Sequence, residues 1–133
     1  MRIMIDTNVI ISSVLFPKGR AAEALKKALT YPYEPILCDY VINEVHRKIL
    51  EKWPESHDEL EEFLSKLLKT IDVVPTPNKT HPTEFKIRDI KDRPILRSAL
   101  NAHADMFLTG DKDFLESSIK DPRIISPTDF LQM

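Results

Sequence analysis

Acidic residues follow two apolar segments of this sequence, at positions suited to binding a metal ion. Asp6 directly follows the apolar run at residues 3–5, and Asp111 follows segment 106–109 after one glycine. Short apolar runs bounded by polar residues are typical of buried strands. Open α/β sheets bind their ligands at the carboxyl ends of the strands, so both carboxylates are expected at such an edge.

Strands that alternate with helices must hold these residues in place. Apolar periodicity and turn residues predict strands at 3–5, 36–38, 73–74, 106–109 and 123–125. Helices are predicted at 9–15, 19–30, 40–53, from 54 to about 71, from 92 to about 103, at 114–118 and from 127 onward. Thr7 or Asn8 is the predicted N-cap of the first helix.

This order of elements predicts the fold class. Alternating strands and helices are typical of a three-layer α/β/α fold, with a central parallel sheet of about five strands flanked by helices. At 133 residues, the chain is expected to form one domain over residues 1–133.

Two further units are predicted to bring carboxylates to the same edge of the sheet. Right-handed crossovers bring each helix up from the C-terminal edge, so the first helical turns lie there. Glu44 lies in the second turn of the helix after the second strand, at the border of its buried face. Asp92 is predicted to cap the helix after the third strand, and Asp113 lies two residues beyond Asp111. One carboxylate from each strand–helix unit therefore converges on one edge.

Such a cluster of carboxylates favours a hard divalent cation. Closely spaced anions repel one another and raise one another's pKa unless a cation lies among them. Mg²⁺ and Mn²⁺ prefer oxygen ligands, whereas zinc sites commonly use cysteine and histidine. The chain has one cysteine, Cys38, and its four histidines are scattered through the sequence. The sequence therefore predicts a Mg²⁺ or Mn²⁺ site rather than a zinc site.

Each acidic residue also has a purely structural interpretation. Asp6, Asp92 and Asp111 could cap helices or stabilise turns. Glu44 alone would be a solvated helix residue, and Asp113 alone would be a surface charge. The joint placement of these residues at one edge is what favours the metal site.

A basic cluster lies beside Asp92 in the sequence. Arg88, Lys91 and Arg93 either form a solvated charged loop or hold a nucleic-acid phosphate backbone next to the metal site. The preceding segment, residues 75–89, is predicted to be a long loop, and long loops are often functional.

The composition excludes several classes of protein. A net charge of −2 does not fit a nonspecific nucleic-acid coat, and 2 glycines exclude glycine-rich phosphate loops. No apolar stretch is long enough to span a membrane, and the N-terminus lacks the pattern of a signal peptide. We therefore expect a cytoplasmic protein with no membrane contact.

Four motifs together resemble the PIN-domain family of nucleases. They are D-T-N after the first strand, V-I-N-E-V around Glu44, D-R-P-I-L-R-S-A-L from Asp92, and F-L-T-G-D-K-D-F from Phe107. The resemblance extends from residue 1 to about residue 130. It is closest to the branch of toxin components of prokaryotic toxin–antitoxin pairs.

This resemblance implies a Mg²⁺- or Mn²⁺-dependent ribonuclease that cuts single-stranded or structured RNA. The acidic positions of the family match Asp6, Glu44, Asp92 and Asp111, with Asp113 as a fifth in many members. Asn8 and Thr109 match positions that hold the acidic side chains, and Asp89 could share the task of Asp92. Many members are homodimers, and a small antitoxin encoded beside each toxin member inhibits it.

We therefore expect metal-dependent hydrolysis of RNA phosphodiester bonds. Asp6, Asp92 and Asp111 would hold the metal, while Glu44 and Asp113 would orient water or bind a second ion. One alternative is a catalytically weak PIN-fold module that binds RNA or a protein. Another is a housekeeping RNA-processing nuclease that is not a toxin. A phosphatase or receiver-type fold is disfavoured, because neither segment 37–39 nor segment 73–75 supplies its phospho-acceptor aspartate.

Overall fold

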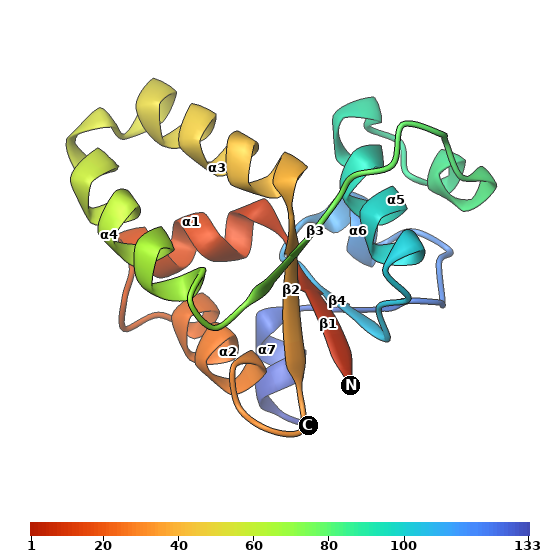
Figure 1. The fold of residues 1–133 in the computed structure, drawn as a ribbon. Helices are drawn as coiled ribbons and strands as arrows, with labels where there is room; N and C mark the ends of the chain where they lie inside the picture. The colour runs from red at the N-terminus through yellow and green to blue at the C-terminus, as the bar shows by residue number, and fades with distance from the viewer.

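Strand β1 lies at the centre of one parallel sheet. The computed structural model describes residues 1–133 and contains strands β1 (Arg2–Ile5), β2 (Glu34–Cys38), β3 (Asp72–Val74), β4 (Met106–Leu108) and β5 (Arg123–Ile125). Their order is β3-β2-β1-β4-β5, and all neighbours are parallel (Figure 1). Ile3 of β1 lies opposite Pro35 of β2 on one side and Met106 of β4 on the other.

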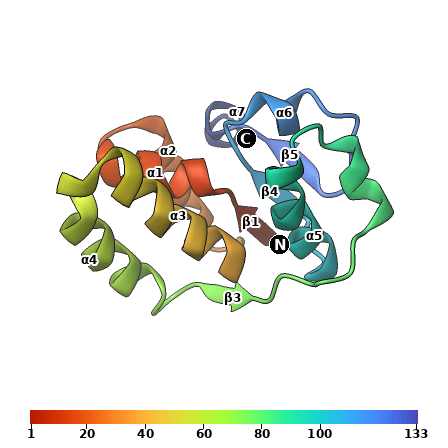
Figure 2. The same ribbon diagram turned by 90° about the horizontal axis from the view of Figure 1, so that it is seen from above.

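Helices cover both faces of this sheet. They are α1 (Thr7–Leu15), α2 (Arg20–Ala28), α3 (Asp39–Lys52), α4 (His57–Leu67), α5 (Arg93–Asn101), α6 (Lys112–Leu115) and α7 (Pro127–Leu131). Helices α1 to α4 lie on one side of the sheet and α5 lies on the other, as Figure 2 shows. The predicted three-layer α/β/α class is therefore confirmed. None of these helices combines the length and the apolar character needed to cross a membrane.

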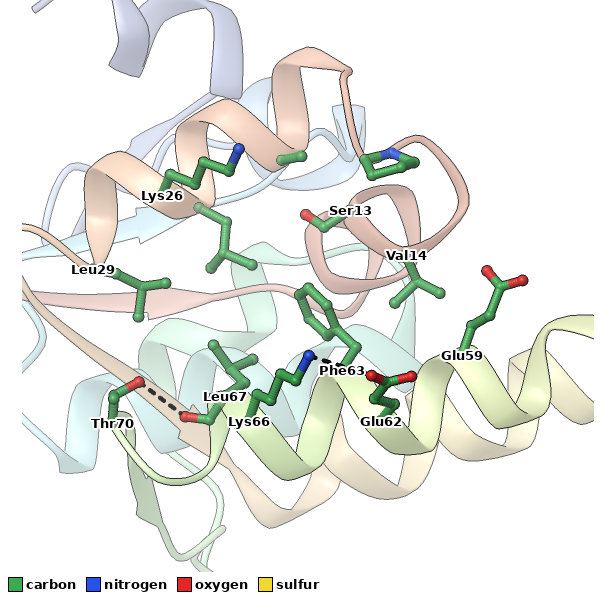
Figure 3. Close-up of a pocket in the computed structure, with 13 residues that line it drawn as sticks. Ser13, Val14, Lys26, Leu29, Glu59, Glu62, Phe63, Lys66, Leu67 and Thr70 are labelled. Carbon is green, nitrogen blue, oxygen red and sulfur yellow. Dashed lines mark hydrogen bonds and ion pairs between the residues drawn. The ribbon is translucent and has the colours of Figure 1, made fainter.

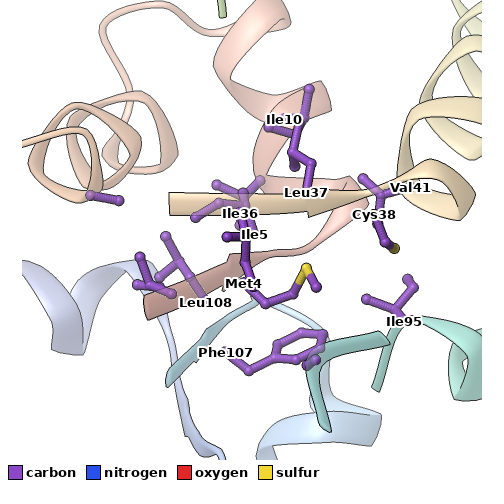
Figure 4. Close-up of a cluster of buried hydrophobic side chains, with 14 of the residues drawn as sticks. Met4, Ile5, Ile10, Ile36, Leu37, Cys38, Val41, Ile95, Phe107 and Leu108 are labelled. Atoms are coloured by element: carbon purple, nitrogen blue, oxygen red, sulfur yellow. The ribbon is translucent and has the colours of Figure 1, made fainter. Parts of the chain in front are cut away.

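The central strands are buried on both faces, which explains their continuous apolar sequences. Met4 and Ile5 of β1, and Phe107 and Leu108 of β4, are each 0% exposed. Met4 pairs in register with Phe107, and Figure 4 shows these side chains within the core. A strand with one solvated face would alternate polar and apolar residues, whereas a parallel strand between two helical layers does not.

Two helices begin directly after acidic residues, which serve as their N-caps. Helix α1 begins at Thr7, so its N-cap is Asp6, and the prediction of Thr7 or Asn8 as N-cap is wrong. Helix α6 begins at Lys112 rather than at residue 114, because the side chain of Asp111 caps it. The ends of β1 and β4 are therefore followed directly by carboxylates that start helices.

Helix α5 begins differently from the prediction. Asp92 occupies its N-cap position, but the Asp92 side chain makes no capping hydrogen bond. Asp89 instead accepts a hydrogen bond from the Lys91 backbone N–H at 3.0 Å and starts a 3₁₀ turn, Ile90–Asp92. The carboxylate of Asp92 is thus left free of main-chain donors.

The predicted long loop before α5 is partly helical and firmly anchored. It contains a 3₁₀ helix, Pro82–Lys86, in which Glu84 is 1% exposed. Both carboxylate oxygens of Glu84 accept hydrogen bonds from Arg97 of α5, each at 2.8 Å. Arg97 also donates to the carbonyl of Pro77 at 2.9 Å. This buried bidentate pair fixes the segment that leads to Asp89 and Asp92.

Candidate metal centre

Asp6 lies at the C-terminal end of β1, where it is 2% exposed. Its Oδ1 accepts a hydrogen bond from the Thr7 backbone N–H at 2.8 Å, and its Oδ2 accepts one from the Thr109 hydroxyl at 2.7 Å. The Asp6 backbone N–H donates to the carbonyl of Leu108 at 3.0 Å, which extends the pairing of β1 with β4. The carboxylate is therefore held in one orientation by a donor at each oxygen.

Thr109 links Asp6 to the acidic residues that follow β4. Its side chain is 0% exposed, and its Oγ1 accepts a hydrogen bond from the Asp111 backbone N–H at 3.0 Å. Oδ1 of Asp111 in turn accepts from the Asp113 backbone N–H at 2.9 Å. One threonine hydroxyl thus connects the ends of the two central strands.

Glu44 enters the site from α3. It lies between Val41 and Val45, which are 0% exposed, and is itself 6% exposed. Arg47 and Lys48 lie 3.8 Å and 3.9 Å from its carboxylate oxygens. Both basic side chains therefore form ion pairs with Glu44, at separations too long for hydrogen bonds. Because Glu44 is buried, the interpretation of it as a solvated helix residue does not hold.

Asp92 lies in a second group of carboxylates at the more open side of the site. Asp89, Asp92 and Asp113 each offer a carboxylate oxygen, and these oxygens lie within 4.8 Å of one another. Arg88 donates to Oδ1 of Asp113 at 2.6 Å. Asp89 therefore lies beside Asp92.

Burial and neighbouring anions act together on Asp6. Loss of solvent is the largest cause that raises its pKa from 3.8 to about 6. The hydrogen bonds from Thr109 and Thr7 act in the opposite direction, and the negative charges of Asp111 and Glu44 raise the pKa further. The fold therefore holds this carboxylate where its charged form is disfavoured.

The pKa of Asp92 is raised by burial and neighbouring anions as well, and no hydrogen bond opposes them. Burial raises its pKa from 3.8 to about 7, with further contributions from the charges of Asp111, Asp6, Asp89 and Glu44. The charges of these residues therefore act on one another. Strongly perturbed acids of this kind are common in functional sites.

The residues present fit a divalent cation. None of Asp6, Asp92 and Asp111 forms an ion pair with a lysine or arginine. The Thr7 hydroxyl, next in the chain to Asp6, is buried without a hydrogen-bond partner. A cation held by the three aspartates would relieve the repulsion between them. Carboxylate and hydroxyl oxygens are the donors that hard cations such as Mg²⁺ and Mn²⁺ prefer.

Asn8 does not join the cluster, whereas Tyr40 does. Asn8 is exposed, and its side chain makes no hydrogen bond to the acidic residues. Tyr40, which the sequence analysis missed, donates its hydroxyl to the carbonyl of Lys91 at 2.7 Å. Burial and the charges of Glu44 and Asp92 raise the pKa of Tyr40. Its spacing of four residues before Glu44, on the same face of α3, is the signal that could have revealed it.

The three basic residues near Asp92 have different environments. Arg88 pairs with Asp113, and Arg93 donates to the carbonyl of Ile87 at 2.9 Å. The Arg93 guanidinium also lies 5.2 Å from the centre of the Phe85 ring. Lys91 is exposed, and its side chain makes no hydrogen bond or ion pair. The structure therefore separates two partnered arginines from one free lysine.

A cavity of about 520 Å³ lies away from the carboxylates, between α1, α2 and α4. Val14, Leu25, Phe63 and Leu67 contribute to its apolar lining, and Figure 3 shows these helices around it. None of the acidic residues at the sheet edge lines this cavity. It is therefore separate from the candidate metal centre.

The fold and the sequence both match known proteins. A family model described as PIN domain matches residues 2–113. Comparison with curated proteins gives no match.

Three solved structures share the fold over nearly the whole chain. The first is VapBC2 from Rickettsia felis, bound to a DNA fragment from its promoter. It has a TM-score of 0.71 and 14% sequence identity, and the match covers 95% of this chain and 98% of that chain. The second is DNA-bound VapBC from Salmonella typhimurium, with a TM-score of 0.69 and 13% sequence identity; the match covers 96% of this chain and 98% of that chain. The third is FitAcB from Neisseria gonorrhoeae, with a TM-score of 0.67 and 20% sequence identity; the match covers 95% of this chain and 98% of that chain.

Proposed function

Because this chain belongs to the PIN domain family, we propose that it is a divalent-metal-dependent endoribonuclease that hydrolyses RNA phosphodiester bonds. The match over residues 2–113 confirms the resemblance predicted from the sequence motifs. The observation that carries the proposal is the convergence of acids at one sheet edge, where burial and mutual repulsion raise the pKa of Asp6 and Asp92. We further propose that residues 1–133 form a single nuclease domain.

The acidic residues divide into ligands and water-positioning groups. Asp6, Asp92 and Asp111 would hold Mg²⁺ or Mn²⁺, and Glu44 and Asp113 would orient water or bind a second ion. When bound, the metal supplies a lowered pKa for water and stabilises negative charge on the phosphate oxygens. Asp6 needs little rearrangement for this task, since both of its oxygens are already fixed by hydrogen bonds.

The burial of the carboxylates indicates how RNA would approach. The Asp6 side chain is closed off at 2% exposed, whereas the Asp113 side chain is 25% exposed and pairs with the exposed Arg88. The site therefore opens toward Asp113 and Asp89. An RNA phosphate would enter from this side, with Arg88 and Lys91 next to its backbone.

Cleavage of a defined RNA by Asp6→Asn tests the proposal. With Mg²⁺ or Mn²⁺, loss of a metal ligand should lower the rate by at least about 100-fold, because it removes several kcal/mol of transition-state stabilisation. The matched control is Asp129→Asn, at an exposed position of α7. If Asp6→Asn keeps its circular dichroism spectrum and cuts RNA at the wild-type rate, the proposal fails.

The binding-module alternative is separated by metal titration. A catalytically weak module that only engages RNA or a protein has no need of a divalent cation at the acidic edge. Titration of the wild-type chain with Mn²⁺ in a calorimeter should show binding that Asp6→Asn loses. Absence of binding at millimolar Mn²⁺ would favour the module.

We also propose that this nuclease is the toxin component of a toxin–antitoxin pair, acting in the cytoplasm. The resemblance of the sequence motifs to the toxin branch of the family supports this role, as does the similarity of the fold to the VapBC and FitAcB structures. A small antitoxin and a second copy of the chain are the proposed partners. Induction of the wild-type chain in cells should stop growth, whereas Asp6→Asn should not, and the small protein encoded beside it should restore growth. Unchanged growth would favour a housekeeping RNA-processing nuclease.

A further inference from the structure

We propose that His46, His57 and Glu61 form a second metal site, which binds Zn²⁺ or a similar borderline cation where α3 meets α4. The sequence separates these residues, so the histidines look scattered. In the folded chain, one donor atom from each of the three side chains lies within 4.8 Å of the other two. This site shares no residue with the acidic edge, and the inference does not rest on the proposed nuclease activity.

The α3–α4 hairpin is what brings the three side chains together. His46 lies on α3, His57 is the first residue of α4, and a 3₁₀ turn at Pro54–Ser56 reverses the chain between the two helices. His57 and Glu61 are four residues apart and lie on the same face of α4. The ligands therefore come from two helices, and one ion would connect them.

The spacing of the donor atoms suits a tetrahedral ion. Oε1 of Glu61 lies 3.0 Å from Nδ1 of His46 and 3.5 Å from Nε2 of His57. Zinc bonds of about 2.0–2.1 Å place two ligands of a tetrahedron about 3.3 Å apart. The two observed distances bracket this value, so small side-chain movements would complete the site.

The donor types indicate which cation would bind. Two imidazole nitrogens and one carboxylate oxygen are ligands typical of Zn²⁺, whereas Mg²⁺ prefers sites made of oxygen alone. The side chains of His46, His57 and Glu61 are 35%, 38% and 51% exposed, so water can reach the fourth position. Bound zinc would then act as a clip between α3 and α4.

Zinc titration of the tag-free chain in a calorimeter tests this proposal, with millimolar Mg²⁺ present to compete at the acidic edge. The variants are His46→Gln and His57→Gln, and the matched control is His103→Gln, an exposed histidine after α5. Loss of an outer-sphere partner already weakens metal binding by roughly 10–100-fold, so loss of a ligand should weaken it at least as much. Wild type and His103→Gln should therefore bind one more Zn²⁺ ion than His46→Gln and His57→Gln.

Thermal unfolding provides a second measurement that does not depend on activity. Zn²⁺ should raise the unfolding temperature of wild type and His103→Gln, but should not do so for His57→Gln. Circular dichroism without metal shows whether each variant folds, and the two histidine variants, on different helices, test the site separately. Equal zinc binding by wild type, His46→Gln and His57→Gln would overturn the proposal and leave His46, His57 and Glu61 as ion pairs only.

Discussion

At the scale of single residues, Asp6 combines two opposing requirements. Its carboxylate is buried beside other acids, which disfavours its charged form and raises its pKa to about 6. A metal ligand, by contrast, must be an anion in a fixed orientation, and Thr7 and Thr109 supply the hydrogen bonds that fix it. Functional sites often hold such unfavourable groups, and a bound cation would resolve the conflict.

Replacement of Asp6 by asparagine should therefore change how stability depends on pH in the metal-free protein. The pKa of Asp6 is raised from 3.8 to about 6, so the folded state binds more protons than the unfolded state over this range. The free energy of unfolding of wild type consequently falls as the pH rises through it. Asparagine does not titrate, so between about pH 5 and pH 8 Asp6→Asn should gain about 1–2 kcal/mol relative to wild type.

Urea unfolding of both proteins in the presence of a chelator measures this difference. Addition of Mn²⁺ should then stabilise wild type and leave Asp6→Asn nearly unchanged, since only wild type keeps the full ligand set. Parallel pH profiles of the two proteins in chelator would show that the pKa of Asp6 is not raised.

Replacement of Arg88 by glutamine should weaken RNA binding with little effect on folding. The Arg88 side chain is 83% exposed, and pairs of this kind add little to stability. Arg88→Gln removes a positive charge beside one phosphate of single-stranded RNA, so KM should rise. The slope of log KM against log salt concentration should become smaller by about 0.7, the value for one lost phosphate contact. The control is Arg123→Gln. Arg123 lies at the N-terminal end of β5, whereas Asp111 lies beyond the C-terminal end of the neighbouring strand β4. An unchanged KM and salt slope would assign Arg88 to its pair with Asp113 alone.

At the scale of secondary-structure elements, the segment before α5 positions the acids around Asp92. Glu84 and Arg97 connect its 3₁₀ helix to α5 through two hydrogen bonds, and Tyr40 connects α3 to Lys91. The Arg97 guanidinium lowers the pKa of Glu84, so the pair stays ionised at neutral pH. One contact thus holds the segment before the turn at Ile90–Asp92, and the other holds the turn itself.

Substitution of Glu84 by glutamine should loosen this segment. It leaves the Arg97 charge, 15% exposed, without its counter-ion, which should lower the free energy of unfolding by about 2–3 kcal/mol. Urea unfolding measures the loss, and the control Glu62→Gln, from an exposed pair with Lys66, should stay within about 0.5 kcal/mol of wild type. In conditions where Glu84→Gln remains folded, its rate of RNA cleavage should also be lower than that of wild type. Wild-type stability and cleavage in Glu84→Gln would contradict the anchoring role.

The elements were predictable where local sequence determines them. The continuous apolar runs of β1 and β4 predict buried strands, and the helix predicted from residue 54 to about 71 contains α4, in which Leu60 and Leu64 are buried. The N-caps were less predictable, because several neighbouring residues can cap a helix and the path of the chain selects among them. Asp6 thus replaced Thr7 or Asn8 as the cap of α1. The proximity of His46 on α3 to His57 and Glu61 on α4 was not predictable either, since it depends on how the two helices pack.

At the scale of the whole molecule, the strand order creates the site. From β1 the chain adds β2 and β3 on one side and β4 and β5 on the other. Ligands of open α/β sheets bind where the strand order changes direction in this way, which here is between β1 and β4. Asp6 and Asp111 follow these two strands. The sequence predicted the edge of the sheet at which the acids gather, whereas the adjacency of β1 and β4 required the folded structure.

Crystals of the wild-type chain grown with Mn²⁺ provide the most direct test, because anomalous diffraction locates manganese without reference to activity. The account predicts an anomalous peak bounded by carboxylate oxygens of Asp6, Asp92 and Asp111, at bond lengths near 2.1–2.2 Å, roughly those of other hard divalent ions. The same experiment on Asp6→Asn should give a weaker peak or none. A wild-type structure with saturating Mn²⁺ and no peak at this edge would contradict the central claim.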